Sequence, residues 1–170
     1  TGSVHITNVA WSPDGGAFLL TAADDANLDY EWTRSKLLTV PSSGGTPKLY
    51  CATQGKIVKA GWLPDGDAIS FLGAAAGGTE QSPGSLFVCR GSGSTPDDLT
   101  EGRTYTVQGY RWRPRGSSAV LSIVQKNVRQ LANLDAATRK VKMMTFAPDV
   151  VSGDVSLSAN GDAIAYTIER

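Results

Sequence analysis

Trp11-Ser12-Pro13-Asp14-Gly15 returns almost unchanged as Trp62-Leu63-Pro64-Asp65-Gly66 and again as Trp112-Arg113-Pro114-Arg115-Gly116. A fainter fourth copy reads Leu157-Ser158-Ala159-Asn160-Gly161. The closing glycines of the four copies are 51, 50 and 45 residues apart. A nearly fixed period of this length is typical of repeat architectures, in which each repeat is one supersecondary unit. The repeat therefore decides the fold.

Each copy has the chemistry of a tight corner. Proline sets φ for the first central position of a type I turn, aspartate tolerates the second, and glycine takes the left-handed position that follows. Arg115 and Asn160 replace the aspartate in the third and fourth copies, but both keep the glycine, which is the hardest residue to replace. We expect the corner residues to be structural. They are Trp11, Pro13, Asp14, Gly15, Trp62, Pro64, Asp65, Gly66, Trp112, Pro114, Gly116 and Gly161.

Short β-branched and aromatic runs flank every corner, so each corner is predicted to join a β-hairpin. The runs that follow the corners cover 17–21, 68–72, 119–124 and 163–168. Two further strands are expected in each of the first three intervals. These are 36–40 and 48–52, then 85–90 and 98–100, then 129–134 and 141–146. No segment has a sustained helical period with caps.

Four strands in a unit of about 50 residues form the blade of a β-propeller. The predicted fold is all-β: a single partial β-propeller over 1–170, with about three and a half four-stranded antiparallel blades. The blade units are approximately 4–53, 54–102, 103–147 and an incomplete 148–170. Propellers close with about four to eight blades. We therefore expect a piece of a longer polypeptide, or alternatively partial propellers that assemble from several chains, and we expect the isolated chain to self-associate.

Composition narrows the function classes. Sixteen basic and sixteen acidic residues leave no net charge, which argues against a nucleic-acid partner. We expect no membrane contact, no cofactor and no metal. The single histidine, His5, and the absence of a Gly-x-Ser-x-Gly string predict no complete hydrolase machinery in this chain. The nearest string, residues 91–95, has the wrong spacing and is expected in a blade turn.

Cys51 and Cys89 fall on predicted strands of neighbouring blades. We interpret them as two half-buried thiols, with one disulfide as the alternative. The cysteine count does not indicate the redox compartment. For a bacterial chain, we expect the cytoplasm or the periplasm.

One insertion and one basic cluster are the candidate binding residues. The insertion, between the second and third strands of the first unit, combines carboxylates with large aromatics that could hold a cationic group such as a peptide amine. Its residues are Asp24, Asp25, Asp29, Tyr30, Glu31 and Trp32. The alternative is a solvated loop whose aromatics cover a blade edge. Arg111 and Arg113 flank Trp112 and should face away from it in a strand, where they could grip a carboxylate or form a solvated face.

The corner followed by a strand such as 17–21 resembles the repeat of TolB-type propellers. It also resembles the N-terminal propellers of prolyl oligopeptidase family serine peptidases, the dipeptidyl-peptidase and acylaminoacyl-peptidase branch. In that branch the propeller covers a separate α/β-hydrolase domain and restricts access to peptides. The resemblance implies a non-catalytic segment that gates and positions peptide substrates for a hydrolase domain absent from this chain. The alternative is a TolB-type protein-interaction propeller with no peptidase partner domain.

Overall fold

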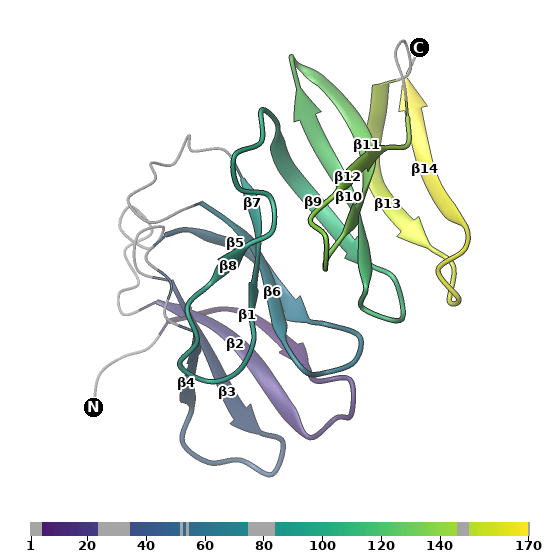
Figure 1. Cartoon of the computed structure of the whole chain (residues 1–170). Helices are drawn as coiled ribbons and strands as arrows, with labels where there is room; N and C mark the ends of the chain where they lie inside the picture. Colours follow the sequence, from purple (N-terminus) through teal and green to yellow (C-terminus); the bar gives the residue numbers. More distant parts are fainter. Residues whose placement is uncertain are drawn as a thin grey trace. The chain divides into compact units, whose positions relative to one another are not determined.

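The computed structural model describes residues 5–23, 35–51, 53, 55–74, 84–145 and 150–169, and all regular structure in these ranges is β-strand (Figure 1). The strands of the first two sheets are β1 (His5–Trp11), β2 (Ala17–Ala23), β3 (Lys36–Pro41), β4 (Lys48–Cys51), β5 (Ile57–Trp62), β6 (Ile69–Gly73), β7 (Ser85–Cys89) and β8 (Asp97–Asp98). Those of the other two are β9 (Thr106–Trp112), β10 (Ser118–Gln125), β11 (Val128–Asp135), β12 (Val141–Met143), β13 (Val150–Leu157) and β14 (Ile164–Glu169).

Consecutive strands pair antiparallel in four separate sheets. Three sheets have four strands, β1–β4, β5–β8 and β9–β12, and the fourth is the pair β13–β14. We call these sheets blades 1 to 4. The prediction of an all-β propeller segment with three complete blades and a partial one is confirmed. The chain divides into two compact units, Thr1–Asp98 with blades 1 and 2, and Leu99–Arg170 with blades 3 and 4.

All four corners are built alike. The amide of Gly15 donates to the carbonyl of Ser12 at 2.9 Å, and the amide of Ser12 donates to the carbonyl of Ala17 at 2.8 Å. Both bonds recur in the other three corners. The closing glycines have φ between 67° and 80°, a region in which a side chain would be strained. The turn residues of the motif therefore form the tight turn between the first and second strands of each blade.

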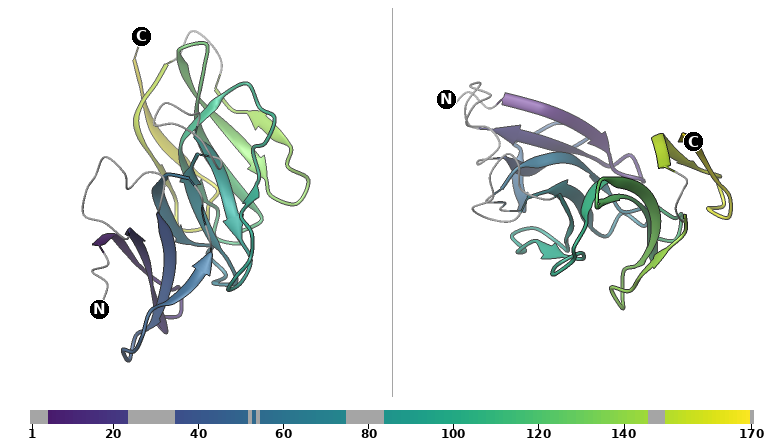
Figure 2. Two further views of the ribbon diagram at one scale, coloured as in Figure 1. Left: turned by 90° about the vertical axis from the view of Figure 1, so that its left-hand side faces the viewer. Right: turned by 90° about the horizontal axis from the view of Figure 1, so that it is seen from above.

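Each blade has two faces. We call the leading face the one that carries the residue before the corner, which is Trp11, Trp62, Trp112 or Leu157, and the trailing face the other. In the first unit the two sheets lie as successive layers (Figure 2). Leu19, Leu37 and Cys51 on the trailing face of blade 1 pack against Ile69 and Phe71 on the leading face of blade 2. Burial of these side chains is the main stabilising term of the layer.

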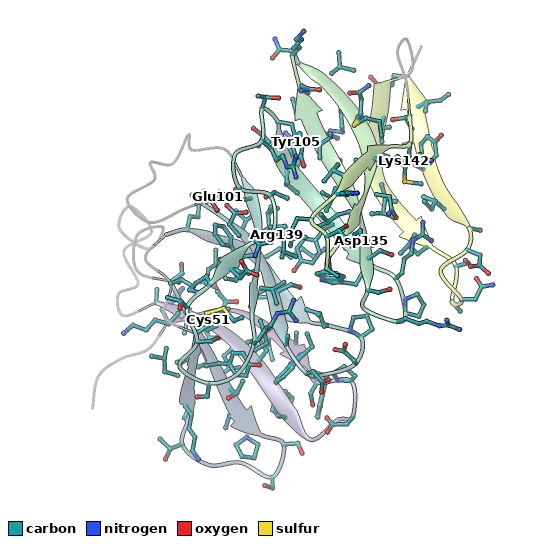
Figure 3. All side chains as sticks on the ribbon, viewed as in Figure 1. Cys51, Glu101, Tyr105, Asp135, Arg139 and Lys142 are labelled. Carbon is teal, nitrogen blue, oxygen red and sulfur yellow. A yellow bond between two sulfur atoms is a disulfide. The ribbon has the colours of Figure 1, made fainter. Side chains whose placement is uncertain are left out.

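A disulfide crosses the same layer. Cys51 in β4 and Cys89 in β7 are bonded, and no described cysteine is free. Figure 3 shows the bond between the sulfur atoms at Cys51. The expectation of two half-buried thiols is therefore wrong. Both positions are fully buried and face each other across the blade interface, so the strand placement was right but the geometry between blades was not readable from spacing.

The turn after β7 adds polar contacts to this interface. The amide of Gly93 donates to the carbonyl of Tyr50 at 2.7 Å, and the amide of Gly91 donates to the Tyr50 hydroxyl at 3.1 Å. The Ser92 hydroxyl donates to the carbonyl of Leu49 at 2.9 Å. Blades 1 and 2 are thus joined by apolar packing, hydrogen bonds and a covalent bond.

In the second unit, Val120 and Leu131 of blade 3 pack against Val151 and Val155 of blade 4, with Leu157 and Ile164 at the edge of the cluster. The strand predicted for 141–146 ends early, at Met143. Beyond Met143, the Thr145 hydroxyl accepts a hydrogen bond from the amide of Leu131 at 2.9 Å. This side-chain hydrogen bond takes the place of a backbone hydrogen bond between β11 and β12. The expected strand at 98–100 is the two-residue β8, Asp97–Asp98, and Leu99 is buried beyond it.

Candidate functional site

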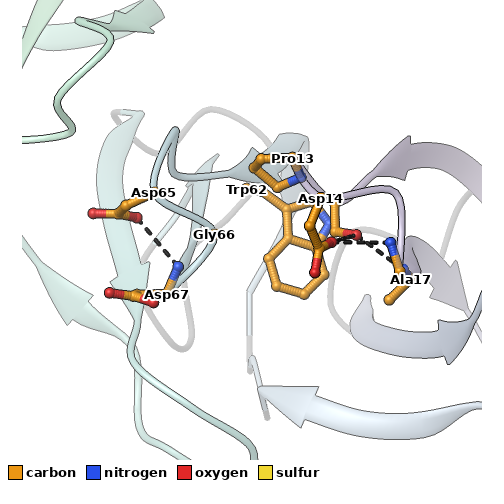
Figure 4. A pocket seen from close by; sticks show the side chains of 9 residues that line it. Pro13, Asp14, Ala17, Trp62, Asp65, Gly66 and Asp67 are labelled. Atoms are coloured by element: carbon orange, nitrogen blue, oxygen red, sulfur yellow. Dashed lines mark hydrogen bonds between the residues drawn. The ribbon is translucent and has the colours of Figure 1, made fainter.

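An open groove of about 650 Å³ lies between the corners of blades 1 and 2 (Figure 4). Its polar lining is acidic: Asp14 comes from the first corner, and Asp65 and Asp67 come from the second. Trp62 forms part of the wall, and its indole N–H is buried and makes no hydrogen bond. The groove can contact a cationic group, because carboxylates attract positive charge.

Hydrogen bonds within the corner fix the Asp14 carboxylate. The Ser12 hydroxyl donates to Oδ1 at 2.6 Å, and the amide of Gly16 donates to the same atom at 2.9 Å. The Ser12 hydroxyl also accepts from the amide of Ala17 at 2.9 Å. Donation by the Ser12 hydroxyl, and then by Gly16, lowers the pKa of Asp14 below its ordinary value. The carboxylate is thus held ionised and oriented.

The fourth corner builds the same network with a neutral side chain. The Ser158 hydroxyl donates to Oδ1 of Asn160 at 2.7 Å, and the amide of Ala163 donates to the Ser158 hydroxyl at 2.9 Å. These bonds match those of Ser12 and Asp14. The serine at the second position of the corner, Ser12 or Ser158, is therefore part of the hydrogen-bond network of the turn. Its presence in both copies is the sequence feature that indicates this network.

The groove does not have the parts of a hydrolase. The Ser12 hydroxyl is committed to Asp14 and to the Ala17 amide, and no histidine is among the lining residues. His5 is exposed at the start of β1. Residues 91–95 lie in the turn after β7, as predicted, where Ser92 and Gly93 bond blade 1.

All six candidate binding residues on the insertion fall outside the described residues. These are Asp24, Asp25, Asp29, Tyr30, Glu31 and Trp32. The strands that carry the insertion are described: β2 ends at Ala23 and β3 begins at Lys36. Because Ala22 pairs with Lys36 and Ala17 with Pro41, Ala23 and Lys36 lie at the ends of β2 and β3 that are opposite the corner.

Arg113 has a structural partner. Its guanidinium donates to the carbonyl of Gly161 in the fourth corner and lies 3.4 Å from Oδ1 of Asn133. Arg111 is half-buried and pairs in register with Val120, on the face opposite Trp112. Both arginines are therefore on the trailing face of blade 3, as the alternation predicted. Arg113 contacts blade 4 there, and no pattern in the sequence indicates this role.

The three corner tryptophans differ in environment. Trp62 packs into the blade 1–blade 2 cluster, with its ring edge-on to Tyr50 at 5.9 Å. Trp112 is half-buried. Trp11 is 61% exposed and contacts Phe18, with ring centroids 4.1 Å apart. The packing role expected of all three therefore holds for Trp62, while Trp11 leaves most of its ring in solvent.

The described residues contain neither a candidate metal site nor a candidate transmembrane helix. No group of three or more His, Cys, Asp and Glu side chains among them is placed to hold a metal ion. None of the described segments is a helix with the length and apolar character of a membrane span.

The fold is that of known propellers. A TolB-type protein from Agrobacterium tumefaciens superposes with a TM-score of 0.69 at 19% identity, over 95% of this chain and 53% of that one. Puromycin hydrolase superposes with a TM-score of 0.70 at 17% sequence identity, over 96% of this chain and 25% of that one. A dipeptidyl aminopeptidase IV homologue from Bacteroides ovatus superposes with a TM-score of 0.66 at 14% sequence identity, over 97% of this chain and 26% of that one. No protein-family model and no curated protein sequence matches the chain.

This chain spans about half, or about a quarter, of the structures that it resembles. At these identities the likeness shows the fold alone. Both groups anticipated from the corner motif, TolB propellers and the propellers of peptidases, are among the similar structures. The chain is therefore a propeller segment of the kind that these two groups share.

Proposed function

We propose that the chain is the non-catalytic propeller portion of a prolyl oligopeptidase-like serine peptidase, in which it gates and positions peptide substrates for a hydrolase domain. The observation that carries the proposal is the length of the connection between the second and third strands. In blade 1 this connection comprises residues 24–35, and in blade 2 it comprises residues 74–84. In blade 3 it comprises only Lys126 and Asn127. Long loops on a rigid scaffold commonly carry binding residues.

The chemistry of the blade 1 connection suits a peptide amine. Its sequence contains the four acidic residues Asp24, Asp25, Asp29 and Glu31 and the two aromatic residues Tyr30 and Trp32. A carboxylate pairs with an ammonium group, and an aromatic face adds a cation–π contact. The peptidases among the similar structures support the same substrate class.

Binding of a short peptide by the purified chain tests the positioning role. We expect a peptide with a free amino terminus to bind in calorimetry, and its N-acetylated form to bind at least about tenfold more weakly, because the charge is lost. Replacing Asp24, Asp25 and Glu31 by their amides should abolish the difference. The matched control is Glu101→Gln with Glu169→Gln, two exposed carboxylates that do not line the corner groove. Equal binding of the two peptides would contradict the role.

The peptidase assignment has its own test. The denatured mass of the product from its native source should be several times that of this chain, with a Gly-x-Ser-x-Gly elbow in the remaining sequence. The chain alone should not turn over chromogenic dipeptide substrates. A parent polypeptide without peptidase activity that retains a protein partner would favour the TolB-type alternative.

A further inference from the structure

The groove between the corners of blades 1 and 2 carries charge of one sign. Asp14, Asp65 and Asp67 line it and are exposed, and none of its lining residues is basic. Its volume of about 650 Å³ lies within the range of pockets that hold small ligands. The groove therefore favours a cation, and the kind of cation follows from its geometry.

The three carboxylates of the groove do not converge on one point. No group of three or more His, Cys, Asp and Glu side chains in the described part of the chain is placed to hold a metal ion. Oδ1 of Asp65 is held by its own corner, where it accepts from the amide of Asp67 at 3.2 Å (Figure 4). Acceptors that are spread along a groove suit a guanidinium group, which has five donors in one plane, better than a point charge.

The second unit holds a guanidinium group at the equivalent place. The strand register aligns Arg113 of the third corner with Ser12 of the first, and Gly161 of the fourth corner with Gly66 of the second. The guanidinium of Arg113 donates to the carbonyl of Gly161. Between blades 3 and 4, the chain thus places a cation of its own across two adjacent corners.

The corners stack in the same way in both units, but less tightly in the first. A Cβ added to Gly66 would lie 3.7 Å from Cδ of Pro13, and one added to Gly161 would lie 2.5 Å from Cδ of Pro114. No described residue donates to the carbonyl of Gly66, and Ser12 bonds only within its own corner. The place that a guanidinium fills in the second unit is therefore open in the first.

The wall of the groove adds an aromatic ring. Trp62 lines it, whereas the equivalent residue of the fourth corner is Leu157. An indole ring attracts a guanidinium group through a cation–π contact. The indole N–H is buried and unpaired, and a carbonyl oxygen of a peptide would give it an acceptor. These two features favour an arginine within a peptide chain as the ligand.

We infer that this groove binds the guanidinium of an arginine side chain carried by another polypeptide segment. Asp14, Asp65 and Asp67 supply the opposite charge, and the carbonyl of Gly66 accepts as that of Gly161 does in the second unit. The inference rests on the internal repeat. It concerns neither the 24–35 connection nor a peptide amine, so it does not require the proposed peptidase role.

An NMR titration of the chain with N-acetylarginine amide tests the inference. This probe has no free amino group, so a positive result is independent of the amine binding proposed above. We expect a saturable shift of the Trp62 indole N–H resonance, which is identified by its loss in Trp62→Phe. The citrulline analogue, which has the same shape without the charge, should bind at least about tenfold more weakly. Absence of the shift, or equal binding of the two probes, would overturn the inference.

Filling the groove from within the chain tests the repeat argument. Ser12→Arg gives the first corner the residue of the third, so it should lower the affinity for the probe at least about tenfold. Ser12→Leu is the matched control, because it loses the same hydrogen bonds to Asp14 without adding a cation, and Leu63 holds this position in the second corner. Equal affinities of the two variants, with urea midpoints that show both to be folded, would contradict the argument.

Removing the charge of the groove is an independent test at exposed positions. Asp65→Asn with Asp67→Asn should weaken binding of the probe at least about fivefold. Glu101→Gln with Glu169→Gln removes the same charge outside the groove and should leave the affinity unchanged. Equal effects of the two pairs would overturn the site.

The same titration of the product from its native source identifies where the arginine comes from. Binding of the probe would assign the arginine to a separate peptide or protein. Exclusion of a probe that the 170-residue chain binds would assign the arginine to the same polypeptide.

Discussion

Gly15 and Gly161 have the same backbone conformation but different surroundings. Their φ values are 71° and 78°, so alanine at either position is strained by about 1–2 kcal/mol. At Gly161 the added carbon would also meet Cδ of Pro114 at 2.5 Å, and a proline ring cannot rotate away. The closing glycine therefore has two separable roles, one within its own turn and one between blades.

We expect Gly161→Ala to lower the free energy of unfolding by roughly 1–3 kcal/mol more than Gly15→Ala, because overpacking adds to the backbone strain. Urea denaturation of the two variants measures the difference. Equal losses would show that the contact between corners adds nothing to stability.

The pH dependence of the first corner follows from the lowered pKa of Asp14. A carboxyl group with a lower pKa in the folded state contributes stability above its unfolded value of about 3.9, and that contribution is lost as pH falls through the folded pKa. Asp14→Asn should therefore make the fall in stability between pH 6 and pH 3 smaller, since Asn160 shows that an amide can fill the same place. Urea midpoints across this range measure it, with Asp67→Asn as the control substitution. An unchanged profile for Asp14→Asn would contradict the assignment.

At the residue scale, the sequence predicted what local chemistry alone dictates. Positive φ at the corner glycines follows from the turn type, and the structure has it at all four. The partner of Arg113 is a carbonyl in another blade, and the partner of Cys51 is a thiol 38 residues away. Both depend on how blades stack, which no local pattern encodes.

At the scale of elements, the disulfide is the strongest single tie between β4 and β7. It closes a loop of 38 residues, for which chain entropy gives a stabilisation of about 4 kcal/mol. We expect reductant to lower the urea midpoint of the parent chain and to leave that of the Cys51→Ser, Cys89→Ser double variant unchanged. Alkylation of the unfolded, unreduced chain should label no cysteine. Labelling of both would refute the bond, and a midpoint insensitive to reductant would refute its stabilising role.

Strand existence was easier to predict than strand ends. Period-two apolar runs between turn residues located the strands because each run has to bury one or both faces. The ends depend on individual hydrogen bonds. The Thr145 hydroxyl, for example, takes the amide of Leu131 and ends β12 three residues before the pattern does.

For the whole molecule, the repeat period predicted the fold because every blade repeats one corner and one set of apolar runs. The candidate site was harder to predict from the sequence than the fold. The groove between the first two corners joins Asp14 to Asp65 and Asp67. Asp14 and Asp65 were expected to be purely structural corner residues, and Asp67 was not singled out. The groove exists because two corners stack, which is a property of neighbouring repeats and of neither copy by itself.

The bond between Cys51 and Cys89 also has a mechanical consequence. When the ends of the chain are pulled apart, force passes through the two sulfurs, and the chain segment between these cysteines, which are 38 positions apart, carries no tension. A stretched single molecule would be shorter by roughly 130 Å at full extension, and the missing length would appear in one step on reduction. β5, β6 and most of the second blade are thus shielded from tension for as long as the two sulfurs stay joined.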